Sequence, residues 1–235
     1  MSSPFIAHLK NRIAEKHLLS HPFYQHWNAG TLPKQVLAKY AEQYYHLEKN
    51  FPRFLAMMRV NADTISGPVI SQNLYDEERD TTHRELWLRF GEGVGATRVE
   101  MENGIPLSET SAAIQTFESL SQSSMDEGVA ALSAYESQIP EVAVSKLDGL
   151  KKHYSIEDAR TTEFFSLHGR VDVTHSEAWW DIIDRRIQED PRLKEKIETA
   201  VIAGRDALWN FLDGVCRSYF PEAFQEMAYA KAYAG

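Results

Sequence analysis

The sequence predicts an all-α protein, built as a single bundle of seven or eight helices. Apolar residues recur at spacings of three and four along nearly the whole chain, and no sustained two-residue alternation bounded by hairpin turns occurs. A hydrophobic fraction of 43% over 235 residues is enough for a substantial core. No internal repeat or low-complexity linker divides the chain, so one domain is expected over residues 1–235.

In the N-terminal half, prolines and glycines set the expected helix boundaries. A helix is expected over 4–19, and a second, short one begins at Pro22, because proline suits the first helical turn. A long helix is expected over 33–60, which Pro52 should kink by removing a backbone donor. The next helix is expected over 67–90, and it ends at a glycine-rich turn.

In the C-terminal half, serines and a proline give the boundaries. A helix starts at 108–109, and Ser124 caps the following helix, which Pro140 should kink. Two long helices are expected over 156–188 and 192–219.

Charge and cysteine content exclude several classes of protein. Lysine and arginine number 25 against 34 aspartates and glutamates, and the net charge of −9 disfavours nucleic acid and anionic membranes as partners. No stretch has the roughly 18 apolar residues of a membrane span, and the N-terminus lacks a signal-peptide pattern. The single cysteine, Cys216, rules out an intramolecular disulfide and fits a cytoplasmic location.

A stripe of potential metal ligands lies within the first of the two last long helices. At about 100° per residue, steps of four and seven bring Asp172 and His175 onto the face of His168. Imidazole nitrogen with carboxylate oxygen suits iron, manganese or zinc, whereas the lack of thiolates argues against an iron–sulfur cluster or a zinc finger. The spacing therefore predicts a metal site built in part from this helix.

Two further segments contain acids that a helical core would not need. Glu136 lies in a stretch of small and apolar residues, where a carboxylate requires a partner or a metal. The segment 73–87 contains another imidazole, His83, with three successive acids before it. In an unbroken helix Asp76 shares a face with His83 whereas Glu77 does not, so helix geometry alone favours Asp76.

Each of these signals has a structural alternative. A single interior histidine is more often a hydrogen-bonded core residue than a ligand, and an acidic run is usually a solvated helix face. Two histidines and an acid on one stripe are harder to explain in that way. Together with Glu136 and the acid and histidine of 73–87 they amount to six ligands from three helices, the pattern of a carboxylate-bridged dimetal centre in a bundle.

With these residues in view, the chain resembles the haem-oxygenase-like dimetal proteins. It is most similar to the group that contains a chlamydial protein associating with death domains and relatives that form 4-aminobenzoate. The similarity extends over about residues 17–212. It rests on HPFYQHW at 21–27, YY at 44–45 followed by FP at 51–52, NLYDEE at 73–78 with His83, YESQIP at 135–140, and His168 with Asp172 and His175. The resemblance implies a haem-oxygenase-like bundle.

The resemblance also implies a ligand set for two metal ions, either two irons or an iron and a manganese. The implied ligands are Glu77, His83, Glu136, His168, Asp172 and His175. The family usually has one more residue between its first glutamate and the histidine, so Glu77 aligns only with a deletion, whereas Asp76 keeps the spacing. Glu77 is preferred because the string NLYDEE aligns without a gap, and Asp76 and Glu78 stay as alternatives.

The same relatives imply an unusual reaction, in which the aromatic ring comes from a tyrosine of the protein itself and an internal lysine is the amino donor. The corresponding positions are Tyr24 and Lys146, while Tyr40 and Tyr135 match tyrosines that would relay electrons or hydrogen atoms. Such an enzyme requires dioxygen and a reductant, here an unidentified electron donor. Packed tyrosines and a solvated surface lysine are the structural alternatives.

Three other functions are compatible with the same scaffold. A cofactorless oxidase of the pyrroloquinoline quinone type would need only a pocket and would leave six ligands unexplained. A thiaminase of the TenA type would need a nucleophilic cysteine, for which Cys216 is poorly placed. A non-enzymatic interaction protein would bind through its surface, yet no helix is marked for that role. The oligomeric state stays open, with a homodimer as one candidate.

Overall fold

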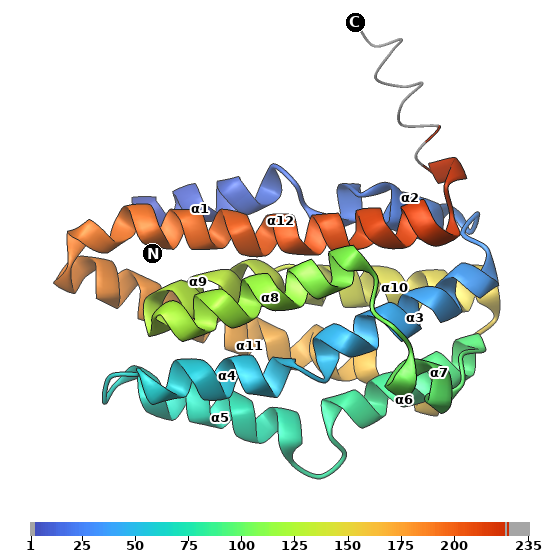
Figure 1. Cartoon of the computed structure of the whole chain (residues 1–235), viewed down its shortest axis with the longest axis horizontal. Coiled ribbons are helices and arrows are strands. Elements are labelled where there is room, and N and C mark those ends of the chain that lie inside the picture. Colours follow the sequence, from blue (N-terminus) through green and yellow to red (C-terminus); the bar gives the residue numbers. More distant parts are fainter. Residues whose placement is uncertain (1–2, 224, 226–235) are drawn as a thin grey trace, which may run out of the picture.

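In the computed structural model, which describes residues 3–223 and 225, every regular element is a helix. Figure 1 shows that most helices run along the long axis of the molecule. The bounds of the α-helices are α1 Pro4–Ala14, α2 Pro22–Ala29, α3 Lys34–Glu48, α4 Phe51–Val60, α5 Ser66–Glu78, α6 His83–Val94, α7 Arg98–Asn103, α8 Ser108–Ser123, α9 Met125–Glu136, α10 Ile139–Tyr154, α11 Ala159–Glu189 and α12 Lys194–Tyr219. The predicted all-α bundle is confirmed, and the described residues form more helices than expected because several predicted helices are divided.

Prolines divide two of the predicted helices instead of kinking them. The helix expected over 33–60 ends at Glu48, and Pro52 lies in the first turn of the next helix, α4. In a first turn the missing N–H of proline would have no intrahelical partner in any case. The helix predicted to kink at Pro140 divides in the same way, since α9 ends at Glu136 and Pro140 lies in the first turn of α10.

The helix expected over 67–90 is also divided, between α5 and α6. Asp80 adopts a left-handed backbone conformation with φ 51°, which a continuing α-helix does not tolerate. Thr82 then caps α6, because its side-chain oxygen accepts a hydrogen bond from the backbone N–H of Glu85 at 3.3 Å. The glycine-rich turn predicted after residue 90 is instead mostly helical, since α6 continues to Val94.

The other boundaries are closer to the prediction. α8 starts at Ser108, and the hydroxyl of Ser124 caps α9 as expected. α1 ends earlier than predicted, at Ala14, and a short 3₁₀ helix, η1, follows at Leu18–Ser20. The short helix α7 was not predicted. The last two helices agree with the predicted ranges to within three residues at each end, and a second 3₁₀ helix, η2 (Pro191–Leu193), precedes α12.

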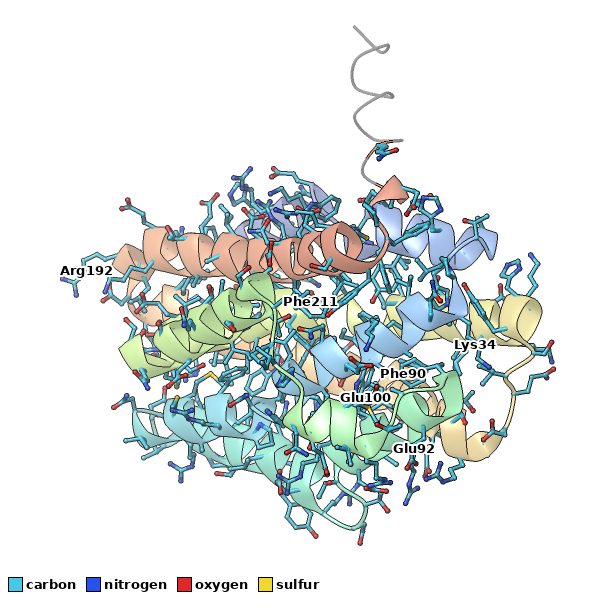
Figure 2. The ribbon with its side chains drawn as sticks, turned by 45° about the vertical axis from the view of Figure 1, so that its right-hand side comes forward. Lys34, Phe90, Glu92, Glu100, Arg192 and Phe211 are labelled. Carbon is cyan, nitrogen blue, oxygen red and sulfur yellow. The ribbon has the colours of Figure 1, made fainter. Side chains whose placement is uncertain are left out.

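The interior lies between the long helices α11 and α12 and the helices that pack on them. α12 packs against α8 and α9, and α11 packs against α6, α9 and α10. Figure 2 shows Arg192 extending away from the molecule, whereas Phe211 of α12 is buried in the core. In the described part of the chain, no helix combines the length and the apolar character needed to cross a bilayer.

Candidate metal centre

The three candidate ligands of α11 lie on one stripe of an unbroken helix. α11 is continuous through this region, so the spacing of four and seven residues brings the three side chains to the same face. His168 and Asp172 are buried, and His175 lies at the edge of the interior with its side chain 12% exposed. The prediction that His168, Asp172 and His175 share one face of a helix is confirmed.

Glu77 and His83 come together because the chain turns between α5 and α6. The Oε2 atom of Glu77 lies 2.8 Å from Nδ1 of His83, and both side chains are buried. In a continuous helix a spacing of six residues would place the two side chains on different faces. The left-handed backbone of Asp80 ends the helix, and the turn that follows brings them together.

The two alternative acids lie further out. Asp76 contacts Nε2 of His175 at 3.4 Å from the rim of the site, and Glu78 is on the surface, where it pairs with Arg84. The preference of helix geometry for Asp76 is therefore wrong, because it assumed an unbroken helix that the structure does not contain. Glu77 is the interior acid of this segment.

One group of ligand atoms consists of Glu48, His83 and His168, which offer one atom each within 4.8 Å of one another. The rings of His83 and His168 are 4.5 Å apart between centroids. Nδ1 of His168 donates a hydrogen bond to the backbone carbonyl of Phe164 at 2.7 Å, which leaves Nε2 as the atom that is free to bind a metal. All three side chains of this group are buried.

A second group consists of Glu136, Asp172 and His175, again within 4.8 Å of one another. Its glutamate is held in place from two sides. The indole N–H of Trp179 donates to Oε2 of Glu136 at 2.9 Å, and the side-chain amide of Asn73 donates to Oε1 at 3.3 Å. Hydrogen bonds of this kind orient the carboxylates of metal sites.

The residues of both groups fit a pair of divalent cations. Among the described residues, Nδ1 of His83 and Nδ1 of His175 are buried without a hydrogen-bond partner, although carboxylate oxygens lie near each of them. A nitrogen and an oxygen that approach one another without hydrogen-bond geometry are arranged as two ligands of a common ion would be. Nitrogen and carboxylate donors without sulfur suit iron and manganese.

Burial makes the charges of this site costly in the absence of a cation. Burial and, next, the charge of Asp172 raise the pKa values of Glu77 and Glu136, and burial also raises the pKa of Asp172 itself. Burial acts to lower the pKa of His175, but the neighbouring carboxylates of Asp172 and Glu136 outweigh it and raise this pKa to about 9. Bound cations would replace the protons that these groups otherwise retain.

Sequence reasoning missed Glu48, the last residue of α3. The signal that could have found it is a helical spacing, because Tyr40, Tyr44 and Glu48 follow one another at steps of four. These three residues therefore share a face, and Tyr44 and Glu48 both line a small internal cavity together with His168 and other residues of the site. A carboxylate on the same face as two interior tyrosines is an interior carboxylate.

Lys146 is buried in the same interior, on α10, and not solvated as its structural alternative assumed. Its Nζ donates a hydrogen bond to the hydroxyl of Tyr40 at 2.7 Å, and that hydroxyl lies 3.4 Å from the hydroxyl of Tyr24. Burial lowers the pKa of Lys146 to about 7, although the negative charge of Glu48 partly opposes this effect. The structure thus brings the predicted lysine and two of the predicted tyrosines into one hydrogen-bonded chain.

Tyr135 is paired with a tyrosine that the sequence analysis did not single out. Its hydroxyl shares a hydrogen bond with the hydroxyl of Tyr44, and both residues line the internal cavity. Tyr44 also lies beside Tyr40, with ring centroids 5.6 Å apart. A continuous series of phenol side chains therefore extends from Tyr24 to the cavity beside the ligands.

Cys216 does not take part in this site. It is fully buried in α12, and burial raises the pKa of its thiol to about 12. A nucleophilic cysteine requires a lowered pKa and access to the substrate. A thiaminase reaction at Cys216 is therefore disfavoured.

Comparisons with known proteins agree with this architecture. A model of the TENA/THI-4/PQQC family matches residues 8–218. A protein of Nitrosomonas europaea named 4-aminobenzoate synthase is 36% identical over 219 residues, covering 88% of this chain and 89% of that protein. A 4-aminobenzoate synthase of Chlamydia muridarum is 33% identical over 216 residues, covering 91% of this chain and 90% of that protein.

A solved structure extends the comparison to the fold. A protein of Shewanella denitrificans, described as a domain with a heme oxygenase-like fold, superimposes with a TM-score of 0.77 at 17% identity, over 93% of this chain and 94% of that chain. At this identity the likeness concerns the fold alone. The chain belongs to the TENA/THI-4/PQQC family, and its fold is haem-oxygenase-like.

Proposed function

We propose that this protein forms 4-aminobenzoate in an oxidative reaction at a dimetal centre, with Tyr24 as the source of the ring and Lys146 as the amino donor. The observation that carries the proposal is the buried Lys146 amine, which bonds to Tyr40 and lies 5.5 Å from the centre of the Tyr24 ring. Two groups of side chains that could hold metal ions lie in the same interior. The two relatives named 4-aminobenzoate synthase support the same product.

The chemistry of the product matches these two side chains. 4-Aminobenzoate has a carboxyl carbon and a nitrogen in para positions of a benzene ring, and tyrosine has its Cβ and its hydroxyl in the same relation. The ring and Cβ of Tyr24 therefore suffice for the carbon skeleton. Product formation then requires cleavage of the Cα–Cβ bond of Tyr24 and oxidation of Cβ to a carboxylate. It also requires replacement of the phenol oxygen, which leaves as water, by the Lys146 nitrogen, and cleavage of the Cε–Nζ bond of Lys146.

A metal pair would be held by Glu77, His83, Glu136, His168, Asp172 and His175, with Glu48 beside them. Two iron ions, or one iron and one manganese, would supply the oxidising power of dioxygen that cleavage of a C–C bond requires, with electrons from an external reductant. Acid–base groups alone do not oxidise a carbon atom.

The protein's own residues hold the reacting groups together and keep water away. The Tyr40 hydroxyl accepts a hydrogen bond from Lys146 and lies beside the Tyr24 hydroxyl. Tyr40 therefore orients the amine toward the Tyr24 ring, which the amine would modify. Tyr24 and Lys146 are each almost fully buried. Tyr44 and Tyr135 lie between the hydrogen-bonded residues Tyr24, Tyr40 and Lys146 and the cavity. There they would pass hydrogen atoms or electrons between the metal centre and Tyr24.

The proposal is tested by reconstituting metal-free protein with Fe(II), alone or with Mn(II), and exposing it to air with ascorbate. We expect 4-aminobenzoate by mass spectrometry and a loss of mass at the peptide that contains Tyr24. Tyr24→Phe should form no product, whereas Tyr75→Phe, which alters a largely exposed tyrosine of α5, should match the parent. Lys146→Arg should also be inactive, with the exposed Lys151→Arg as its control.

Two results would contradict the proposal in different ways. A Tyr24→Phe variant as productive as the parent, with the loss of mass at Tyr40, would move the ring source to the tyrosine that contacts Lys146 directly. Full activity of protein freed of metal by chelation would exclude a dimetal centre and favour a cofactorless oxidase.

A further inference from the structure

Glu48 is a buried carboxylate for which the surrounding protein offers no partner. It is 5% exposed at the end of α3, and within the described residues its carboxylate has no hydrogen bond and no ion pair. Lys146 acts on it only as a charge at a distance. Because a buried carboxyl without a partner costs folding free energy, such a residue usually serves a bound group.

Imidazole nitrogens lie close to Glu48 on the side of the candidate ligands. One oxygen of Glu48 lies within 4.8 Å of a ring nitrogen of His83 and of His168. Nδ1 of His83 is buried and makes no hydrogen bond to the described residues, although Oε2 of Glu77 lies 2.8 Å from it. Nδ1 of His168 already donates to the Phe164 carbonyl. Carboxylate and imidazoles are thus grouped around a common point without bonding to one another.

We propose that Glu48 is a further protein ligand of the metal centre, and that Glu48, His83 and His168 together hold one of its two ions. Two histidines and one carboxylate form the facial arrangement typical of non-haem Fe(II) sites with open coordination positions. The other group, with Glu136, Asp172 and His175, is richer in oxygen. The inference rests on the dimetal part of the proposed function and adds a ligand outside the six predicted ones.

A ligand at Glu48 would join the metal centre to the helix of the reacting tyrosines. Tyr40 and Tyr44 precede Glu48 by eight and four residues on α3, which places all three on one face. The charge of Glu48 acts on Tyr40, Tyr44 and Lys146 as well as on His83. Coordination of Glu48 would therefore fix the position of α3 relative to α6 and α11.

The test compares Glu48→Gln with the parent by metal titration. Glutamine keeps the length of the side chain and removes its charge, and Glu42→Gln on the same helix is the matched control, because Glu42 is similarly buried but bonds to Lys39. We expect the parent to bind two equivalents of Fe(II). Glu48→Gln should bind one of them at least tenfold more weakly and change the electron paramagnetic resonance spectrum of the loaded protein, while Glu42→Gln should match the parent.

A stability measurement distinguishes the loss of a metal ligand from a failure of the variant to fold. Metal-free Glu48→Gln should melt at a higher temperature than the metal-free parent, because on folding the parent must either bury a charge or take up a proton at Glu48, whereas glutamine does neither. The variant should gain less stability on addition of Fe(II). Two unchanged equivalents and an unchanged spectrum would overturn the role of Glu48 and leave the dimetal proposal intact. A parent that binds no Fe(II) would overturn the dimetal centre itself, and the role of Glu48 with it.

Discussion

Lys146 has an environment that is rare for a lysine. Its ammonium position lies within 6.0 Å of the centres of six aromatic rings, and no ion pair to it occurs in the described part of the chain. Lysine is almost never fully buried without a partner. The helical spacing of α10 places Lys146 on the same face as the buried Val142 and Leu150. The sequence analysis did not use this signal, so only the resemblance to a family singled the residue out.

The pKa of Lys146 predicts how product formation depends on pH. With a pKa of about 7, the amine is mostly charged at pH 6 and mostly neutral at pH 8. Only the neutral amine has the lone pair that forms a bond to carbon, so the initial rate of product formation should rise about tenfold between these pH values. The measurement is the initial rate of metal-loaded protein, with metal content checked at each pH. A flat profile at constant metal content would show that Lys146 is not the titrating donor.

Trp179 should influence metal affinity, because it orients the carboxylate of Glu136. Trp179→Phe removes the 2.9 Å hydrogen bond to Glu136 and keeps most of the packing. Loss of such an outer contact typically weakens metal binding about 10–100-fold, so one of the two Fe(II) equivalents should be affected. Trp180→Phe, a neighbour that does not contact Glu136, is the control, and equal Fe(II) affinities for the two variants would refute the assignment.

Among the elements, α11 could be predicted from the sequence and the α5–α6 turn could not. The stripe of His168, Asp172 and His175 needs only an unbroken helix, whose period is fixed by its backbone. The turn depends on one left-handed residue, Asp80, which no periodicity reveals. The choice between Asp76 and Glu77 was open for that reason.

Two substitutions at Asp80 should therefore differ in how strongly they affect stability. Asp80→Gly relieves the left-handed conformation and should change the free energy of unfolding by less than about 1 kcal/mol, whereas Asp80→Val should lower it by about 1–2 kcal/mol. Chemical denaturation of the metal-free proteins measures both. If valine were tolerated as well as glycine, the turn would not depend on the backbone of this residue.

At the scale of the whole molecule, apolar periodicity was sufficient to predict an all-α bundle but not the number of its helices. Proline removes one hydrogen-bond donor, and whether a helix then bends or ends depends on tertiary packing. Here the helices end four residues before the prolines, at Glu48 and Glu136, and Pro52 and Pro140 lie in the first turns of the next helices. Those two ends place Glu48 and Glu136 beside the site. Glu136 was found because it follows a run of small and apolar residues, and Glu48 was missed because Lys49 and Asn50 make its segment polar.

A metal pair that joins α3, α5, α6, α9 and α11 should stabilise the entire bundle. At Fe(II) concentrations about 100-fold above the dissociation constant, each site adds about 2.7 kcal/mol to the free energy of unfolding. The gain should shrink as pH falls, because protons compete for carboxylates whose pKa values are raised, such as Glu77 and Glu136. Melting temperatures with Fe(II) and with chelator, from pH 8 to pH 5.5, measure the effect, and identical values at pH 8 would contradict it.

The origin of the product atoms tests the central claim most directly. Protein labelled with ring-¹³C tyrosine and side-chain ¹⁵N lysine would be loaded with Fe(II), or with Fe(II) and Mn(II), and exposed to air and ascorbate in unlabelled buffer. The account predicts 4-aminobenzoate with six ¹³C atoms and one ¹⁵N atom, at no more than one molecule per chain. Unlabelled 4-aminobenzoate, or many molecules per chain, would show that the ring and the nitrogen come from an external substrate.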